Sequence, residues 1–203
     1  MRPTCLRCLR PAAACVCEGL PRIPSRTRVV ILQHPREARL AICSAWLTRI
    51  ALENASLHRG VRFDDDPEVR AAAAIPGAAV LFPGDAALPV DAAAGAPPPV
   101  LFAIDGTWHQ AARLLDRNPA LAALPRISVH AGRPGGYGDL RREPAEGHLA
   151  TIEAVALALG ALERDPARFE PMLEAFRRMV EAQLACARGE RRNPRHRGGQ
   201  RTG

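Results

Sequence analysis

The sequence predicts an α/β fold, with a mostly parallel sheet that carries helices on both faces. Short, continuous apolar runs alternate along the chain with segments of helical spacing, and strands that alternate with helices typically form a parallel sheet. The runs contain no alternating polar residues, which is typical of strands buried on both faces. The length of 203 residues and the hydrophobic share of 47% fit one globular domain with small additions.

The alternation begins in the first half of the chain. The first predicted strand is Arg28–Gln33 (RVVILQ), and residues 38–52 follow as a helix because their apolar side chains recur at helical spacing. Further strands are predicted at residues 80–82 and 100–104, and a turn containing glycine ends each of them. Between these strands, residues 86–99 are rich in Ala and Pro without a period, which predicts a mobile surface loop.

The second half continues the same pattern. A helix is expected to begin at Thr107, because Gln110 follows it at the spacing of a capping box. Residues 126–130 are the next predicted strand, and a Gly-rich loop over residues 132–138 follows it. Two further amphipathic helices are predicted at residues 151–163 and 169–187.

A cysteine cluster near the N-terminus predicts a metal site. Cys5, Cys8, Cys15 and Cys17 are close in the sequence, and in a reducing compartment such pairs are more often metal ligands than disulfides. Four thiolates can surround one Zn²⁺ in a closed tetrahedral site. A closed site has no open coordination position, so the predicted zinc is structural. The alternative is that these cysteines are free thiols.

Composition divides the chain into three predicted parts. Residues 1–22 form a zinc knuckle, residues 23–187 form the α/β domain, and residues 188–203 form a disordered basic tail. The formal net charge is +7, and the tail holds six arginines against a single glutamate. Such a tail can attract the phosphates of RNA. The alternative is a solvated tail without function.

Membrane and secretion signals are not found in the sequence. It has no run of about 20 apolar residues that would span a bilayer, and the N-terminus does not follow the pattern of a signal peptide. The sequence therefore predicts a cytoplasmic protein with no membrane partner. It leaves the oligomeric state open.

Asp105 is a candidate catalytic residue because of its position. It follows the buried run VLFAI and opens the segment Asp105-Gly106-Thr107-Trp108. In open α/β sheets, ligands bind beyond the carboxyl ends of the strands, so a carboxylate at that place faces the ligand crevice. The alternative is structural: Asp105 makes a turn, Thr107 only caps a helix, and Trp108 is part of the core.

Two further segments carry polar groups at comparable positions. His34, Arg36 and Arg39 follow the first predicted strand, and arginines near the start of a helix can hold a carboxylate or a phosphate. The second runs from Tyr137, near the end of the Gly-rich loop, to Pro144 and resumes at Thr151-Ile152-Glu153-Ala154; glycines in the loop allow close approach of a ligand. The alternatives are a solvated helical turn and a flexible loop followed by an N-capped helix.

The order of these motifs resembles the DTW-domain family, which is named for its Asp-x-Thr-Trp signature. The motifs are the four-cysteine knuckle, His34-Pro35-Arg36-Glu37, Phe82-Pro83-Gly84, Asp105-Gly106-Thr107-Trp108, Leu140-Arg141-Arg142 and Thr151-Ile152-Glu153-Ala154. The resemblance implies a tRNA-uridine aminocarboxypropyltransferase with a trefoil-knot fold related to the SPOUT methyltransferases. Residues 23–187 would then be the catalytic domain.

The resemblance also implies a reaction. The 3-amino-3-carboxypropyl group of S-adenosylmethionine moves to N3 of a uridine in tRNA, and methylthioadenosine is released. By this comparison Asp105, Thr107 and Trp108 are catalytic, with Asp105 as the base or as the group that orients the N3–H. The residues expected to bind S-adenosylmethionine are Pro83, Gly84, Tyr137, Leu140, Arg142, Thr151 and Glu153. Those expected to bind the substrate are His34, Arg36 and Arg39, with Arg36 or Arg142 available to the transferred carboxylate.

Two other functions remain as alternatives. A SPOUT-type RNA methyltransferase would produce S-adenosylhomocysteine instead of methylthioadenosine. A non-catalytic RNA-binding protein would use only the zinc knuckle and the basic tail, and it would leave Asp105 without a role. The small-molecule product formed from S-adenosylmethionine and tRNA distinguishes all three.

Overall fold

A computed structural model describes residues 3–8, 10, 12, 15–40, 43–84, 86–94, 96–129 and 149–188. The strands are β1 (Arg28–Gln33), β2 (Ala55–Arg59), β3 (Ala79–Leu81), β4 (Leu88–Pro89), β5 (Val100–Asp105) and β6 (Arg126–Ser128). The α-helices are α1 (Ala45–Ala51), α2 (Pro67–Ala73), α3 (Trp108–Asp116), α4 (Pro119–Ala122), α5 (Thr151–Leu162) and α6 (Pro166–Ala187). Two 3₁₀ turns are η2 (Glu37–Arg39) and η3 (Val90–Ala93).

The described strands form one parallel sheet in the order β2-β1-β5-β3-β6-β4. β1 and β5 lie side by side at its centre and pair over their full length, from Arg28 opposite Val100 to Gln33 opposite Asp105. β5, the fifth strand in the sequence, is therefore inserted between β1 and β3. As a result, the carboxyl ends of β1 and β5 meet at one edge of the sheet.

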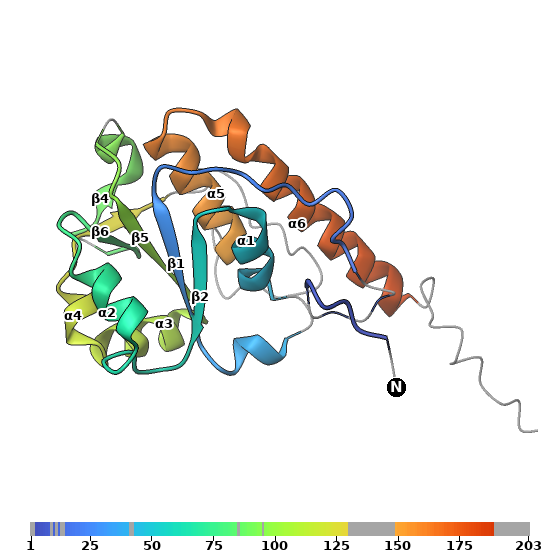
Figure 1. Cartoon of the computed structure of the whole chain (residues 1–203), viewed down its shortest axis with the longest axis horizontal. Helices are drawn as coiled ribbons and strands as arrows, with labels where there is room; N and C mark the ends of the chain where they lie inside the picture. Colours follow the sequence, from blue (N-terminus) through green and yellow to red (C-terminus); the bar gives the residue numbers. More distant parts are fainter. Residues whose placement is uncertain are drawn as a thin grey trace, which may run out of the picture.

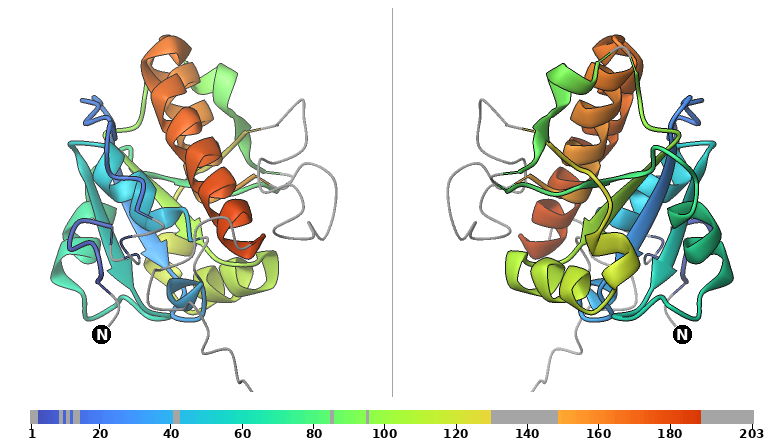
Figure 2. Two further views of the ribbon diagram at one scale, coloured as in Figure 1. Left: turned by 90° about the vertical axis from the view of Figure 1, so that its right-hand side faces the viewer. Right: turned by 90° about the vertical axis from the view of Figure 1, so that its left-hand side faces the viewer.

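Helices cover both faces of the sheet, as the sequence predicts (Figures 1 and 2). Along β1, Val29 and Ile31 pack into the core under α1, α5 and α6. The intervening Val30 and Leu32 pack into a second core under α2, α3 and α4. Since both faces are buried, the strands need apolar side chains at every position, and this explains why their sequences show no alternation.

Two predicted segments differ from the structure. The helix predicted from residue 38 begins only at Ala45, because Leu40 has extended backbone (φ −80°, ψ 133°) that ends the 3₁₀ turn η2. The loop predicted over residues 86–99 is wrong in part, since it contains β4 and η3. Val90 in this segment is buried and packs against α5. This contact stabilises a segment whose own sequence shows neither a helical nor a strand period.

Three further elements were not predicted. β2 is the edge strand beside β1, and its residues ASLHR are half-buried or exposed, so it has no continuous apolar run. α2 and α4 are short helices that each begin at a proline, after Asp66 and Asn118 respectively. Asp-Pro and Asn-Pro are recognisable signals for the start of a helix, but the two helices are too short to show an apolar period.

Some predictions concern residues that the structure does not describe. The Gly-rich loop at 132–138 and nearly all of the tail at 188–203 are outside the described ranges. The trefoil knot stays a prediction, because residues 130–148, which connect β6 to α5, also lie outside them. The division at residue 22 stays a prediction as well, although Val16 and Leu20 pack into the same core as α6.

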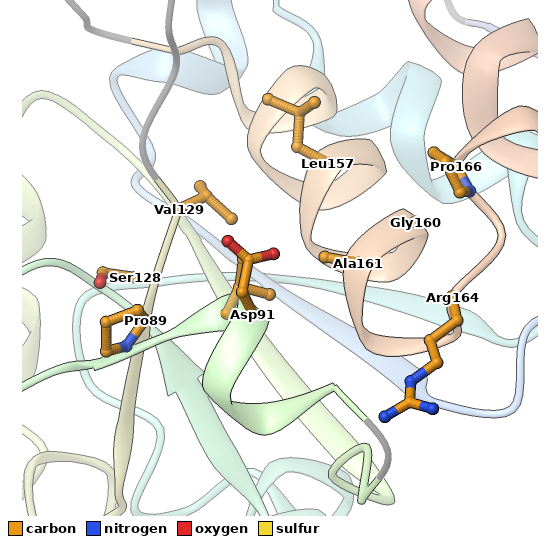
Figure 3. Close-up of a pocket in the computed structure, with 10 residues that line it drawn as sticks. Pro89, Asp91, Ser128, Val129, Leu157, Gly160, Ala161, Arg164 and Pro166 are labelled. Atoms are coloured by element: carbon orange, nitrogen blue, oxygen red, sulfur yellow. The ribbon is translucent and has the colours of Figure 1, made fainter.

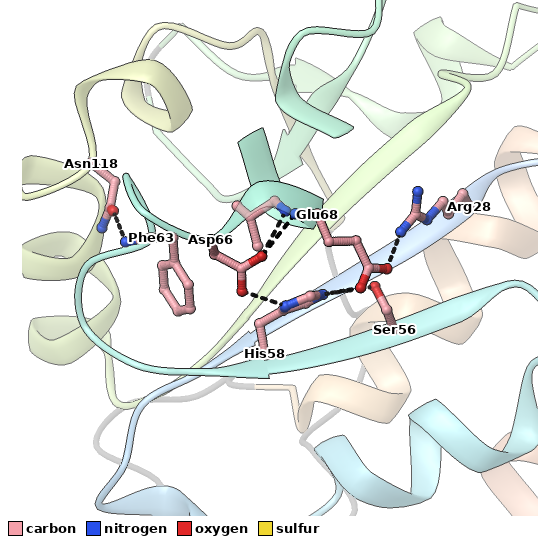
Figure 4. A network of polar contacts seen from close by, with 8 residues as sticks. Arg28, Ser56, His58, Phe63, Asp66, Glu68 and Asn118 are labelled. Atoms are coloured by element: carbon pink, nitrogen blue, oxygen red, sulfur yellow. Dashed lines mark hydrogen bonds and ion pairs between the residues drawn. The ribbon is translucent and has the colours of Figure 1, made fainter. Parts of the chain in front are cut away.

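A polar network fastens α2 to the edge of the sheet (Figure 4). Asp66 caps α2, since its Oδ1 accepts hydrogen bonds from the backbone N–H groups of Glu68 (3.0 Å) and Val69 (3.1 Å). Its Oδ2 lies 2.7 Å from Nδ1 of His58 on β2, and Nε2 of the same ring lies 3.1 Å from the Ser56 hydroxyl. The helix start and the edge strand therefore share one carboxylate.

This network predicts a pH-dependent contribution to stability. Partial burial raises the pKa of Asp66, but the Val69 N–H, the His58 ring and the Glu68 N–H outweigh burial and leave the pKa lowered. A lowered pKa in the folded state stabilises the protein at neutral pH, and this contribution is lost as the pH falls through the folded-state pKa. Asp66→Ala is expected to lower the free energy of unfolding by about 1–2 kcal/mol at pH 7. Urea unfolding at pH 7 and pH 3 should show a smaller loss at pH 3.

Asp66→Asn is the control, because asparagine also caps helices well. We expect it to keep the part of the stability that comes from the cap and to lose the pH-dependent part that comes from the charge. Equal losses for the two variants would mean that the cap is not the source of the effect.

Candidate functional site

Polar side chains form a row at the carboxyl edge of the sheet. Arg59 of β2, Gln33 of β1 and Asp105 of β5 are opposite one another in the strand register. Residues in register on neighbouring strands point to the same face of a sheet. By the alternation along β1, this is the face that α1 and α5 cover.

The carboxylate of Asp105 is buried, with 7% of the residue exposed. Its Oδ1 accepts a hydrogen bond from the hydroxyl of Thr151 (2.5 Å), the first residue of α5. Its Oδ2 accepts one from Nε2 of Gln33 (2.9 Å). The N-terminus of α5, the positive end of its helix dipole, lies at the same place. Asp105 is therefore a buried hydrogen-bond acceptor held at both oxygens.

Cys43 and Arg59 complete the surroundings of this carboxylate. The sulfur of Cys43 lies 3.8 Å from Oδ2 of Asp105 and 2.9 Å from Nε2 of Gln33. Burial and the negative charge of Asp105 raise the pKa of Cys43 to about 11, so this residue is a neutral thiol at pH 7. Arg59 donates from Nε to Oε1 of Gln33 (3.1 Å).

Thr107 and Trp108 lie just after Asp105 but have different surroundings. The side chain of Thr107 accepts from the backbone N–H of Gln110 and completes the predicted capping box of α3. Trp108 is 42% exposed, and its ring packs edge-on against Phe82, with centroids 5.6 Å apart. The guanidinium of Arg126 lies over the Phe82 ring at 5.6 Å. Trp108 is thus a partly exposed aromatic surface near the carboxyl edge of the sheet.

The residues predicted to bind substrate follow β1. The backbone N–H of His34 donates to the carbonyl of Asp105 (2.9 Å), which places this turn beside the carboxylate. Nδ1 of His34 accepts from the backbone N–H of Arg36 (3.2 Å). Arg36 and Arg39 are exposed. Their charged groups are therefore accessible to a ligand from solvent.

The residues predicted to bind S-adenosylmethionine are only partly described. Pro83 and Gly84 are exposed in the turn after β3, the strand next to β5. Gly84 has φ +153°, a conformation that side chains disfavour. Glu153 is buried and accepts from the backbone N–H of Ala150 (2.9 Å), so it caps α5. Three predicted residues lie outside the described ranges: Tyr137, Leu140 and Arg142.

Sequence reasoning missed Gln33, Cys43 and Arg59 as neighbours of Asp105. Gln33 could have been found, because it is the polar last residue of an apolar strand that pairs with the strand of Asp105. Arg59 belongs to the strand that was not predicted. Cys43 has no local signal that points to this site.

The four N-terminal cysteines are close together, as predicted. Their sulfurs all lie within 4.8 Å of one another, and the Cys5–Cys17 and Cys8–Cys15 pairs are each 3.8 Å apart. Four sulfurs about 2.3 Å from one Zn²⁺ form a tetrahedron with edges of about 3.8 Å. The backbone N–H groups of Cys8 and Arg7 lower the pKa of Cys5 to about 6, which favours a thiolate. These residues therefore fit a tetrahedral zinc ion.

The knuckle contacts the α/β domain near the start of α1. Nε1 of Trp46 donates to the carbonyl of Arg7 (2.8 Å), and Nη2 of Arg10 donates to the carbonyl of Cys43 (3.2 Å). Cys43 also contacts Asp105 and Gln33. The predicted zinc segment and the carboxylate site are consequently neighbours in the fold.

A separate cavity of about 440 Å³ lies between η3, the end of β6 and α5 (Figure 3). This volume is within the range of small-molecule sites. The described lining residues include Asp91 and Arg164, and the Arg164 guanidinium donates to the carbonyl of Ala94 (3.1 Å). None of the described lining residues was predicted to belong to a site, and Asp105 is not among them. The cavity is therefore distinct from the carboxylate site.

The fold and site define an α/β protein with a buried carboxylate at the carboxyl edge of a parallel sheet and a four-cysteine knuckle beside it. The family model described as the DTW domain matches residues 2–184. The chain belongs to this DTW family. The resemblance seen in the sequence motifs is therefore confirmed.

Related proteins carry names that specify an activity. The tRNA-uridine aminocarboxypropyltransferase 2 of Drosophila melanogaster is 31% identical over 90% of this chain and 76% of its own length. The protein of the same name from Macaca fascicularis is 30% identical over 90% of this chain and 64% of its own length. The tRNA-uridine aminocarboxypropyltransferase A of Arabidopsis thaliana is 29% identical over 90% and 81%.

No solved structure matches the chain significantly. Among the helices in the described ranges, none is both long and apolar enough to cross a membrane.

The sulfur geometry predicts one bound zinc per chain. Cys8→Ser is expected to release it, because a neutral hydroxyl is a poor replacement for a buried thiolate ligand. Metal analysis of the purified protein measures the loss, and proteolysis of residues 1–22 should accelerate in the variant because the metal fixes their backbone. Cys186→Ser is the control, since Cys186 lies on α6 outside the cluster, and it should retain zinc. Full zinc retention in Cys8→Ser would refute the ligand assignment.

Proposed function

We propose that the protein transfers the 3-amino-3-carboxypropyl group of S-adenosylmethionine to N3 of a uridine in tRNA. The observation that carries this proposal is the buried, doubly hydrogen-bonded carboxylate of Asp105 at the carboxyl edge of the sheet. The membership in the DTW family and the names of the relatives support the same activity. A tRNA-modifying role also fits the predicted cytoplasmic location.

The reaction requires a base close to the uracil ring. A bond forms between N3 and the γ-carbon of the methionine part, and the bond from this carbon to sulfur breaks. The electron pair stays on sulfur, so methylthioadenosine leaves as a neutral molecule. The N3 proton passes to a carboxylate oxygen of Asp105, which retains a free lone pair beside its contacts with Thr151, Gln33 and Cys43.

Other residues at this edge would position the substrates. Trp108 presents an exposed ring on which a nucleobase can stack. Arg36 and Arg39 are exposed after β1 and can hold a phosphate or the carboxylate of the transferred group. Because attack at the methyl carbon would give a different product, the reaction depends on this positioning. Pro83, Gly84 and Thr151 are proposed to lie near S-adenosylmethionine.

The predicted zinc has a structural role in this proposal. Cys5, Cys8, Cys15 and Cys17 would hold it, and a closed four-sulfur site supplies a fixed backbone but no open position for a reactant. The knuckle would then support the start of α1 through Arg7 and Arg10.

The product identifies the reaction. Incubation with S-adenosylmethionine and unmodified tRNA is expected to yield methylthioadenosine, detected by mass. S-adenosylhomocysteine would instead indicate a methyltransferase, and no small-molecule product would indicate a non-catalytic RNA-binding protein.

Asp105→Asn is expected to slow transfer by roughly 10²-fold or more, the usual contribution of a positioned base. Asparagine keeps the size of the side chain, so folding and S-adenosylmethionine binding should survive. A single-turnover assay with saturating tRNA measures the chemical step.

Thr107→Ala is the control for this experiment. Its side chain caps α3, so we expect a loss of about 1 kcal/mol of stability and a much smaller change in rate. A near-normal rate for Asp105→Asn would show that Asp105 is not the base.

Removal of residues 188–203 is expected to weaken tRNA binding. Six arginines are lost with this segment, and each phosphate contact contributes to the dependence of affinity on salt. A salt titration of tRNA binding should therefore show a flatter slope, while the single-turnover rate at saturating tRNA stays close to normal. An unchanged slope would mean that the tail does not contact RNA.

A further inference from the structure

Gln33 is the polar side chain that connects β1 to the carboxylate site. It is 1% exposed, and both the NH₂ group and the carbonyl oxygen of its amide are hydrogen-bonded. Nε2 donates to Oδ2 of Asp105 and to the sulfur of Cys43, both at 2.9 Å. Oε1 accepts from Nε of Arg59 at 3.1 Å. A buried amide with three partners has a single favourable orientation.

Arg59 determines which way this amide points. The guanidinium of arginine can only donate hydrogen bonds, so the atom of Gln33 that faces it must be the carbonyl oxygen. The NH₂ group then faces Asp105. If the amide were reversed, two donors would meet at Arg59 and two acceptors would meet at Asp105, and the second clash is costly because the carboxylate is buried.

The O–H and N–H hydrogen bonds to Asp105 come from different elements, while the thiol of Cys43, a weak donor, lies 3.8 Å from Oδ2. Thr151 at the start of α5 holds Oδ1, and Gln33 on β1 holds Oδ2. A single hydrogen bond would leave the carboxylate free to rotate about its Cβ–Cγ bond, whereas two bonds on opposite oxygens fix its plane. The direction of the remaining lone pairs depends on that plane, and proton transfer needs a lone pair aimed at the proton.

We propose that Gln33 is a positioning residue for the transfer reaction, in which it fixes the plane of the Asp105 carboxylate while Arg59 fixes the orientation of the Gln33 amide. This inference rests on the proposed function, because the group being positioned is the proposed base. Gln33 itself need not touch the uridine or S-adenosylmethionine.

Gln33→Met tests the proposal, since methionine has a similar length and shape but cannot donate to Asp105. The single-turnover rate is measured in the normal chain and in the Asp105→Asn chain, and dissociation constants for tRNA and S-adenosylmethionine are measured in parallel. We expect a loss of roughly tenfold or more in the normal chain, because small misplacements of a reacting group are costly. We expect less than a twofold further loss in the Asp105→Asn chain, with dissociation constants little changed.

Gln33→Glu is the second variant. It keeps an acceptor for Arg59 but replaces the NH₂ donor to Asp105 by a second carboxylate oxygen. We expect it to lose activity at least as strongly as Gln33→Met and to move the pH profile of the single-turnover rate toward higher pH, because two carboxylates in contact retain a proton between them. This change of the pH profile is not expected of a residue with a purely structural role.

Asn118→Leu is the matched control. Asn118 is also a buried amide with several hydrogen bonds: Oδ1 accepts from the N–H of Phe63, and Nδ2 donates to the carbonyls of Val61 and Leu114. It lies at the start of α4, and these partners are not among the residues that contact Asp105. Any rate loss that it causes should be the same in the normal and the Asp105→Asn chains.

The outcomes separate the two proposals. The positioning role is overturned if Gln33→Met lowers the single-turnover rate by the same factor in both chains, or lowers it in neither. In both cases, transfer by the normal chain still supports the proposed function. If the normal chain produces no methylthioadenosine, the proposed function fails. Melting temperatures of Gln33→Met, Asp105→Asn and the double variant then test the contact without substrates: additive losses overturn it, and non-additive losses support it.

Discussion

The pairing of β1 with β5 is the interaction on which the rest of the structure depends. The two strands run parallel over six residues, and their apolar side chains supply both cores of the sheet. The same register ends with Gln33 opposite Asp105, so the hydrogen bonds that build the sheet also bring the site together. A shift of one residue would turn Asp105 toward the other face of the sheet, away from Thr151. The fold and the site are thus determined by one alignment of strands.

This dependence explains which parts of the fold could be predicted from the sequence. β1 and β5 are buried on both faces, so their sequences are apolar at nearly every position and stand out from the rest. β2 has only one neighbour in the sheet and contains Ser, His and Arg, so no local pattern marks it. The 3₁₀ turn η2 and the extended Leu40 consist of residue types that are also common in helices. Cys43, which lies between Leu40 and α1, contacts Arg10 and Asp105, and both of these residues are distant in the sequence.

The site shows a similar division. Asp105 could be predicted because it follows a buried strand, and the cysteine cluster could be predicted because its spacing suits a metal. The neighbours of Asp105 come from β1, β2 and the turn before α1, which are far apart in the sequence and meet only in the sheet. The motif residues Thr107 and Glu153 are hydrogen-bonded to the starts of α3 and α5. A sequence motif can therefore combine residues that face a substrate with residues that shape the helices beside it.

The position of α5 has a consequence for how this chain can vary in length. Its first residue, Thr151, bonds to Asp105 at the carboxyl edge of the sheet. Just past its other end, Glu163 accepts from the backbone N–H groups of Arg26 (2.8 Å) and Thr27 (3.3 Å), which precede β1 at the opposite edge. The helix has 12 residues, about 18 Å, and it therefore spans about the length of the strands beneath it. One inserted residue would rotate one end by about 100° relative to the other, so both anchors could not be kept. An insertion or deletion within α5 would therefore break one of its two anchors.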